Sequence, residues 1–225
     1  IKSSITDALD AHNNLNDIVA TQKPTMRSNF LTKLLMGYIK PSEIDDETLE
    51  FMDINFRSNS FMVIILQINS ESSFFESNNE KERALARFVI ENVGSELMEE
   101  NNMEQYFVEI DTNIVASIVN PHSEMDTELL EGQVEHYAVN LLKALELCEL
   151  DVTIGISDAH NGIVELKECY DEALNVLNYS LLIGSNNIIF FNELNVKDDY
   201  YYYPIEMEVK IMNMLRSGDY SNIED

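Results

Sequence analysis

The chain has 225 residues, which is enough for one sizeable core with extra helices or for two small domains. Its 41 Asp and Glu against 14 Lys and Arg give a formal net charge of −27. Nucleic acids and anionic membranes attract clustered basic residues, so this charge argues against direct contact of this segment with either.

The apolar runs are too short for membrane insertion. The stretch at residues 61–66 is well below the length of a membrane span, and no signal peptide is visible. We therefore expect this segment to be cytoplasmic, with the full-length protein either free or membrane-anchored. The chain begins with Ile, which suggests a piece of a longer protein.

The two cysteines, Cys148 and Cys169, both fall in apolar patterns with helical spacing. Two cysteines are too few for a disulfide framework in a chain of this length, and neither belongs to a CxxC pair. We predict reduced thiols in the core, with no cofactor or metal bound by either. A nucleophile or metal ligand is the less favoured interpretation.

Residues 1–55 are predicted to form a helical connector. A weak seam repeats every seven residues and allows a homodimer through the N-terminal helix, although the histidine in it and the surrounding asparagines weaken it. The seam consists of Ile5, His12, Val19 and Met26, with Ala8 and Leu15 between them. Pro24 restarts a helix, Gly37 ends it, and Ser42 is a candidate N-cap for a short helix that follows.

Residues 56–195 are predicted to form one α/β domain. Strand-like runs cover residues 61–69, 106–110, 114–120, 151–157 and 188–191, and apolar residues at helical spacing lie around 85–97, 130–145 and 163–181. This order predicts an α+β fold: a ferredoxin-like βαββαβ core with an added helix and strand. We expect this core to have a mainly antiparallel sheet with its helices on one face, and the 61–69 strand to be central and covered on both faces.

Residues 196–225 are predicted to be a tail linker and a helix that leads to a further domain. Pro204 starts the helix and Gly218 ends it. The tyrosines at Tyr200–Tyr203 favour packing of the linker over stacking on a ligand. The helix has an apolar face suited to an interdomain contact, formed by Met207, Ile211, Met212 and Leu215.

Several short motifs occur in the same order over about 190 residues. They are Phe30, Leu31, Leu34, Leu35 and Gly37; Ile154 and Gly155; Ala173, Leu174, Gly184 and Asn186; and Tyr201–Pro204, Glu206, Glu208, Leu215, Gly218 and Asp219. With the order of elements, they resemble the GGDEF domain family of diguanylate cyclases. More specifically, the chain resembles the degenerate GGDEF-like middle domain of AraC-type transcriptional regulators from Firmicutes.

The resemblance implies where a cyclase would hold Mg²⁺ and GTP: on the first strand and in the following hairpin. The first strand carries the neutral Gln67 and Asn69, and the hairpin at 109–114 keeps the carboxylates Glu109 and Asp111 but has no glycine pair. Asp111 is better explained as a turn former. The product-inhibition motif RxxD occurs only at Arg216–Asp219, in the tail helix. We therefore predict that the chain is not an enzyme and has no catalytic or metal residues.

Two other groups of polar residues have the composition of a site. His122, Glu124 and Asp126 are close enough in sequence to suggest metal ligands, but a solvated loop is favoured there. Asp158 and His160 resemble a catalytic pair, although capping of the next helix is favoured. No GxSxG nucleophile motif occurs.

The sequence thus predicts a non-catalytic signal-transmitting and dimerisation domain of an AraC-type regulator. The resemblance implies an upstream membrane sensor or two-component receiver domain and a downstream helix-turn-helix domain that binds DNA. The alternative is a ligand-binding sensor with a vestigial nucleotide cleft, which the absence of phosphate-binding glycines and basic residues at 106–120 disfavours. An active diguanylate cyclase is the least favoured reading.

Overall fold

A computed structural model describes residues 21–183 and 188–194, all within one compact unit, Ile1–Leu194. The predicted seam at residues 5–19 and the tail at 196–225 lie outside the described residues. Within the described ranges, none of the helices has the length and apolar character needed to cross a membrane.

The chain order of the elements matches the predicted order. A helix over residues 21–35 leads to η1 (Pro41–Glu43) and α2 (Asp46–Phe51). The central elements are β1 (Ser60–Ile68), α3 (Glu80–Glu100), β2 (Met103–Asp111), β3 (Ile114–Pro121), α4 (Thr127–Leu147) and β4 (Val152–Ile156). They are followed by β5 (His160–Asn161), η2 (Ile163–Glu165), α5 (Leu166–Ile183), β6 (Ile188–Phe190) and α6 (Phe191–Leu194).

The strands form one mixed sheet in the order β2-β3-β1-β4-β6. All neighbours in the βαββαβ core are antiparallel, whereas the added β6 runs parallel to β4, and the short β5 pairs with the start of β1. This confirms the predicted α+β fold class. Strand β1 lies in the middle of this order. Every residue from Ser60 to Leu66 is buried, as expected for a strand covered on both faces.

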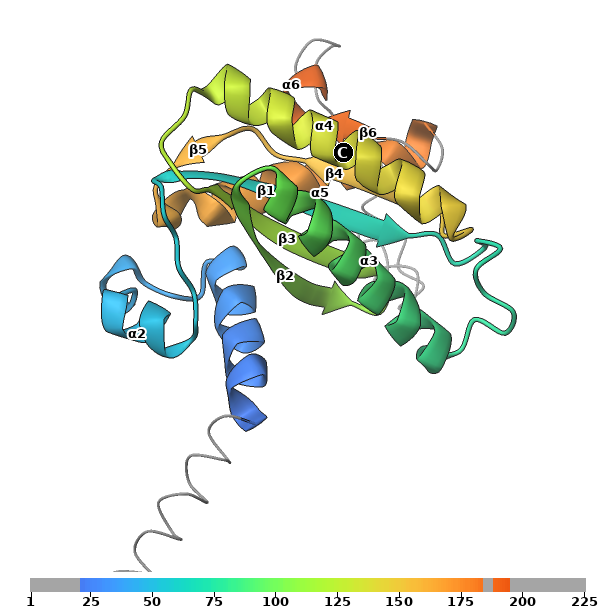
Figure 1. The fold of residues 1–225 in the computed structure, drawn as a ribbon, viewed down its shortest axis with the longest axis horizontal. Coiled ribbons are helices and arrows are strands. Elements are labelled where there is room, and N and C mark those ends of the chain that lie inside the picture. Colours follow the sequence, from blue (N-terminus) through green and yellow to red (C-terminus); the bar gives the residue numbers. More distant parts are fainter. Residues whose placement is uncertain (1–20, 184–187, 195–225) are drawn as a thin grey trace, which may run out of the picture. The chain divides into compact units, whose positions relative to one another are not determined.

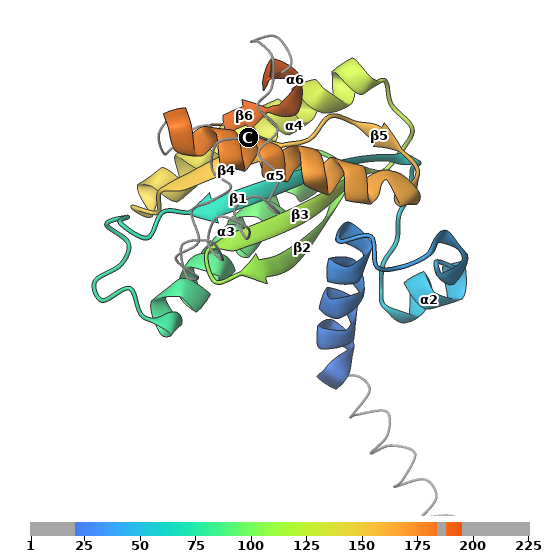
Figure 2. The ribbon, with the colours of Figure 1, turned by 180° about the vertical axis from the view of Figure 1, so that it is seen from behind.

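Helices cover both faces of this sheet: α3 and α4 of the βαββαβ core share one face, as predicted, and the added helix α5 and the helix at 21–35 cover the other. Met62, Ile64 and Leu66 pack in the core beneath α3 and α4, which lie in front of the sheet in Figure 1. The alternate residues of β1 point the other way, toward α5, which lies in front in Figure 2, and toward the helix at 21–35. An uninterrupted apolar strand has two apolar faces, and each of them requires a cover.

Two details of the helices differ from the prediction. In α3 the buried face is Ala86, Ile90 and Gly94, whereas Leu85 and Phe88 of the predicted apolar face are 51% and 61% exposed. The apolar residues of α3 are spread over more of its circumference than one face can bury, so their spacing did not show which side of the helix packs on the sheet. The side chain of Asp45, rather than Ser42, caps α2 by accepting a hydrogen bond from the Thr48 N–H.

The two free cysteines differ in exposure. Cys169 is buried in α5, as predicted, but Cys148 is exposed at the C-cap of α4, where the apolar face of that helix has ended. Burial raises the pKa of the Cys169 thiol to about 12, so it remains protonated at neutral pH.

Candidate functional site

The two segments singled out in the sequence, the end of β1 and the β2–β3 hairpin, lie side by side. Gln67 pairs with Ile114 of β3 on one side and with Thr153 of β4 on the other. The Ile68 N–H donates to the carbonyl of Asn113 at 2.8 Å. The sheet register therefore brings the neutral strand end against the turn of the hairpin.

The polar side chains of this region form local hydrogen bonds. The Asn69 side chain accepts from the Glu71 N–H at 2.9 Å. The Asp111 carboxylate accepts from the Thr112 N–H at 2.6 Å and from the Thr112 hydroxyl at 3.3 Å. These contacts are typical of an aspartate that forms a turn, as the sequence indicated.

A buried arginine that sequence reasoning missed organises the hairpin. Arg87 of α3 is 8% exposed, and its Nη1 donates to the Thr112 carbonyl at 2.8 Å. Its Nη2 lies 2.8 Å from a Glu80 oxygen, and its Nε lies 3.2 Å from a Glu109 oxygen. The charge of Glu109 is thus compensated from within the protein. The signal was available, because Arg87 lies three residues before the buried Ile90 on the same helical face.

A second carboxylate lies near this cluster. Burial raises the pKa of Glu91, and the nearby Glu109 raises it further, while Arg87 lowers it. The hairpin site therefore combines one guanidinium with several carboxylates, an arrangement that fastens the turn to α3.

His122, Glu124 and Asp126 make separate contacts. Glu124 accepts from the Asn59 N–H at 2.7 Å and so ties its loop to the start of β1. The His122 Nε2 lies 3.3 Å from a Glu104 oxygen, and Asp126 is the N-cap residue of α4.

Asp158 and His160 meet through a third residue, Glu172 of α5. The Nε2 of His160 lies 3.0 Å from both carboxylate oxygens of Glu172, one of which accepts from the Asp158 N–H at 3.1 Å. Burial raises the pKa of Glu172, and His160 lowers it. Glu172 lies 12 residues beyond His160, so sequence proximity did not reveal the contact.

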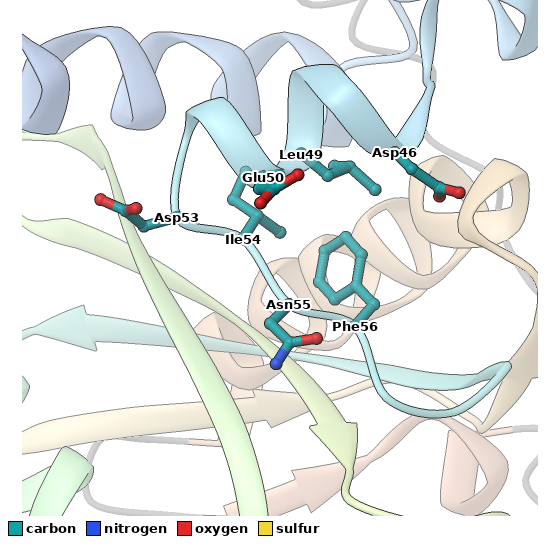
Figure 3. A pocket seen from close by; sticks show the side chains of 7 residues that line it. All are labelled: Asp46, Leu49, Glu50, Asp53, Ile54, Asn55 and Phe56. Carbon is teal, nitrogen blue, oxygen red and sulfur yellow. The ribbon is translucent and has the colours of Figure 1, made fainter.

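An open pocket of about 550 Å³ adjoins α2, shown in Figure 3. It is lined by Asp46, Leu49, Glu50, Asp53, Ile54, Asn55 and Phe56. In Figure 3 the apolar side chains gather between the carboxylates of Asp46 and Asp53. The lining carries no basic side chain, so it offers no charged donor to a phosphate group.

Comparison with known proteins finds similarity to one transcriptional regulator in sequence and to two GGDEF-type structures. No family model matches the chain. It is 19% identical over 228 residues to the uncharacterized HTH-type transcriptional regulator YtdP of Bacillus subtilis, covering 97% of this chain and 28% of that protein. The chain thus spans little more than a quarter of the curated relative.

Two solved structures are similar to part of the chain. The active GGEEF domain of a diguanylate cyclase from Vibrio cholerae is 12% identical, with a TM-score of 0.44, over 59% of this chain and 83% of that one. An EAL/GGDEF domain protein from M. capsulatus is 17% identical, with a TM-score of 0.41, over 59% of this chain and 85% of that one.

These comparisons correct one prediction. The sequence led us to predict that the chain is not an enzyme, but one of its structural neighbours is described as the active domain of a diguanylate cyclase. The prediction is therefore wrong as it was drawn.

Proposed function

We propose that this chain is the signal-transmitting and dimerisation segment of an AraC-type transcriptional regulator. In this proposal a GGDEF-like domain lies between an upstream sensor or receiver module and a downstream helix-turn-helix domain. The similarity to an HTH-type regulator over 97% of this chain supports it. The net charge of −27 supports DNA contact by another part of the protein.

The observation that carries the proposal is the burial of the connector helix in the core of the domain. Leu31, Leu34 and Leu35 of the helix at 21–35 are at most 4% exposed. They belong to one apolar cluster with Phe61 of β1 and Ala173 of α5. A displacement of the helix must therefore repack the residues beneath the sheet.

Such a helix connects an input module mechanically to the rest of the chain. Packed cores have discrete arrangements, so a change imposed on the helix is passed to β1 and α5 as a change in packing. The opposite side of the helix bears Met26, which is 40% exposed and continues the seven-residue seam. In the proposal this side contacts the same helix of a second copy.

The dimerisation part is tested by analytical ultracentrifugation of the 225-residue chain. We expect a dimer at micromolar concentration, and we expect Met26→Glu to weaken it at least about tenfold, because the substitution places a charge in an apolar seam. Thr25→Glu adds the same charge at an exposed neighbouring position and should leave dimerisation unchanged. A wild-type chain that stays monomeric would refute this part.

The regulatory part is tested in the full-length protein by measuring its occupancy of chromosomal DNA. We expect occupancy of discrete promoters, with expression of the bound genes altered by Met26→Glu but not by Thr25→Glu. A full-length protein that occupies no promoter would overturn the assignment to transcription regulators.

A further inference from the structure

The junction between β5 and α5 brings together an imidazole and two carboxylates. His160 is fixed by the pairing of β5 with β1, in which it lies opposite Phe61. Gly162 has φ +104°, a conformation that favours glycine, and it turns the chain from β5 into η2. As a result, His160, Glu165 and Glu168 each place one atom that could bind a metal within 4.8 Å of those of the other two.

The imidazole is oriented by a fourth side chain from outside this group. The Nε2 of His160 faces both carboxylate oxygens of Glu172 at 3.0 Å, which leaves Nδ1 as the ring nitrogen able to act as a ligand. Histidines that bind metals commonly hold their second nitrogen against a carboxylate in this way, because it fixes the tautomer and raises the basicity of the ligand. Glu172 is itself held by the Asp158 N–H.

Among the described residues, the charges of the two glutamates, Glu165 and Glu168, are not balanced by an ion pair with a lysine or arginine. The adjacent Lys167 is paired with Asp171. A preference for acidic residues near a helix N-terminus accounts for two carboxylates at these positions. It does not account for an imidazole nitrogen beside both of them, nor for the carboxylate that orients the ring.

We propose that His160, Glu165 and Glu168 bind a divalent first-row transition-metal cation, with Glu172 positioning the histidine. One nitrogen and two oxygen donors suit Zn²⁺, Mn²⁺ or Co²⁺, whereas Mg²⁺ and Ca²⁺ prefer oxygen alone. Ligands of a tetrahedral ion with bonds of about 2.0–2.1 Å are about 3.3 Å apart. The ligand atoms, which lie within 4.8 Å of one another, must therefore move closer together to bind the ion. Rotation of the exposed Glu168 and half-buried Glu165 side chains allows this. The proposal does not depend on the regulatory function.

Calorimetric titration of the 225-residue chain with Zn²⁺ at high salt tests the site. A chain of charge −27 attracts every cation loosely, and salt screens that general attraction while a coordinated ion is retained. We expect one saturable site per chain. His160→Asn and Glu168→Gln should each weaken binding at least about tenfold, and Glu172→Gln about tenfold through the orientation of the ring.

Matched controls remove the same groups elsewhere. His136→Asn and Glu146→Gln alter an exposed histidine and an exposed glutamate of α4, and both should bind Zn²⁺ as the wild type does. As a second readout, paramagnetic Mn²⁺ should broaden the imidazole NMR signals of His160 before those of His136.

Three results would overturn the proposal: no saturable site in the wild type, equal affinity in His160→Asn and His136→Asn, or equal broadening of both imidazoles. If His160→Asn does not fold, Glu168→Gln still decides, because its side chain is exposed. Binding by Glu168→Gln that equals that of Glu146→Gln would then refute the site.

Discussion

Gly155 lies at a close approach of β4 and α5, so an added methyl group there should destabilise the fold. A Cβ atom at this position would lie 2.7 Å from the Ala173 carbonyl oxygen, 3.2 Å from Val176 Cγ1 and 3.3 Å from Leu177 Cγ. The nearest obstacle is helix backbone, which cannot rotate away as a side chain can. We therefore expect Gly155→Ala to displace α5 from the sheet.

The expected magnitude follows from two opposing effects. Ordinary contact begins at 3.4 Å, so α5 must move by several tenths of an ångström, and overpacking of this kind costs about 1–3 kcal/mol. We take the upper end because the obstacle is backbone. Alanine also restricts the unfolded chain, which offsets about 0.5–1 kcal/mol. The net loss in the free energy of unfolding is therefore about 2 kcal/mol.

Urea unfolding followed by circular dichroism measures this loss, with the free energy extrapolated to water. Gly132→Ala is the matched control, since nothing beyond the chain neighbours and the backbone of its own helix lies within 4 Å of the added Cβ. Gly132 is inside α4, where alanine is the better helix former, so the control should gain about 1 kcal/mol. If Gly155→Ala is as stable as the wild type while Gly132→Ala gains stability, the close approach of β4 and α5 is wrong.

Three further predictions test the core, the thiols and a half-buried carboxylate. Leu35→Ala should lower the free energy of unfolding by about 2–5 kcal/mol because Leu35 is fully buried, whereas Leu147→Ala, at an 88% exposed position, should change it by less than about 0.5 kcal/mol. In the native chain a maleimide should modify the exposed Cys148 rapidly, and Cys169 only after unfolding, as mass spectrometry of labelled peptides will show. Because burial raises the pKa of Glu91, Glu91→Gln should stabilise the fold at pH 7, and urea titrations should show the gain disappearing as the pH falls toward the ordinary glutamate value of 4.5.

Each of these has a contradicting outcome. Equal losses for Leu35→Ala and Leu147→Ala would contradict the burial of the connector helix. Equal labelling rates for the two cysteines would contradict their different exposure. A gain for Glu91→Gln that persists unchanged at low pH would show that the ionised carboxylate is not its source.

The parts of the fold that the sequence predicts well depend on patterns within one element. In α4 the residues at helical spacing, Leu130, Val134, Tyr137, Leu141 and Leu145, are all buried as predicted. Strand β1 and the β2–β3 turn are equally clear, because a continuous apolar run and a short polar turn each have few structural solutions.

The parts that the sequence does not predict depend on contacts between elements. The phase of α3 was ambiguous, since Leu85 and Phe88 continue its apolar pattern onto the exposed side. Arg87 reaches a turn 25 residues away, and His160 meets a glutamate on the next helix. Neither pairing leaves a periodic signal in the sequence, because only the packing of the helices on the sheet brings the groups together.

The burial of the helix at 21–35 also decides where this domain can be cut for expression or fusion. A junction at residue 56, where the composition changes, would leave out Leu31, Leu34 and Leu35 and expose the apolar side of β1 that they cover. Such a truncated domain would present a hydrophobic surface and aggregate. Any fusion of this domain should therefore keep this helix together with the sheet on which it packs.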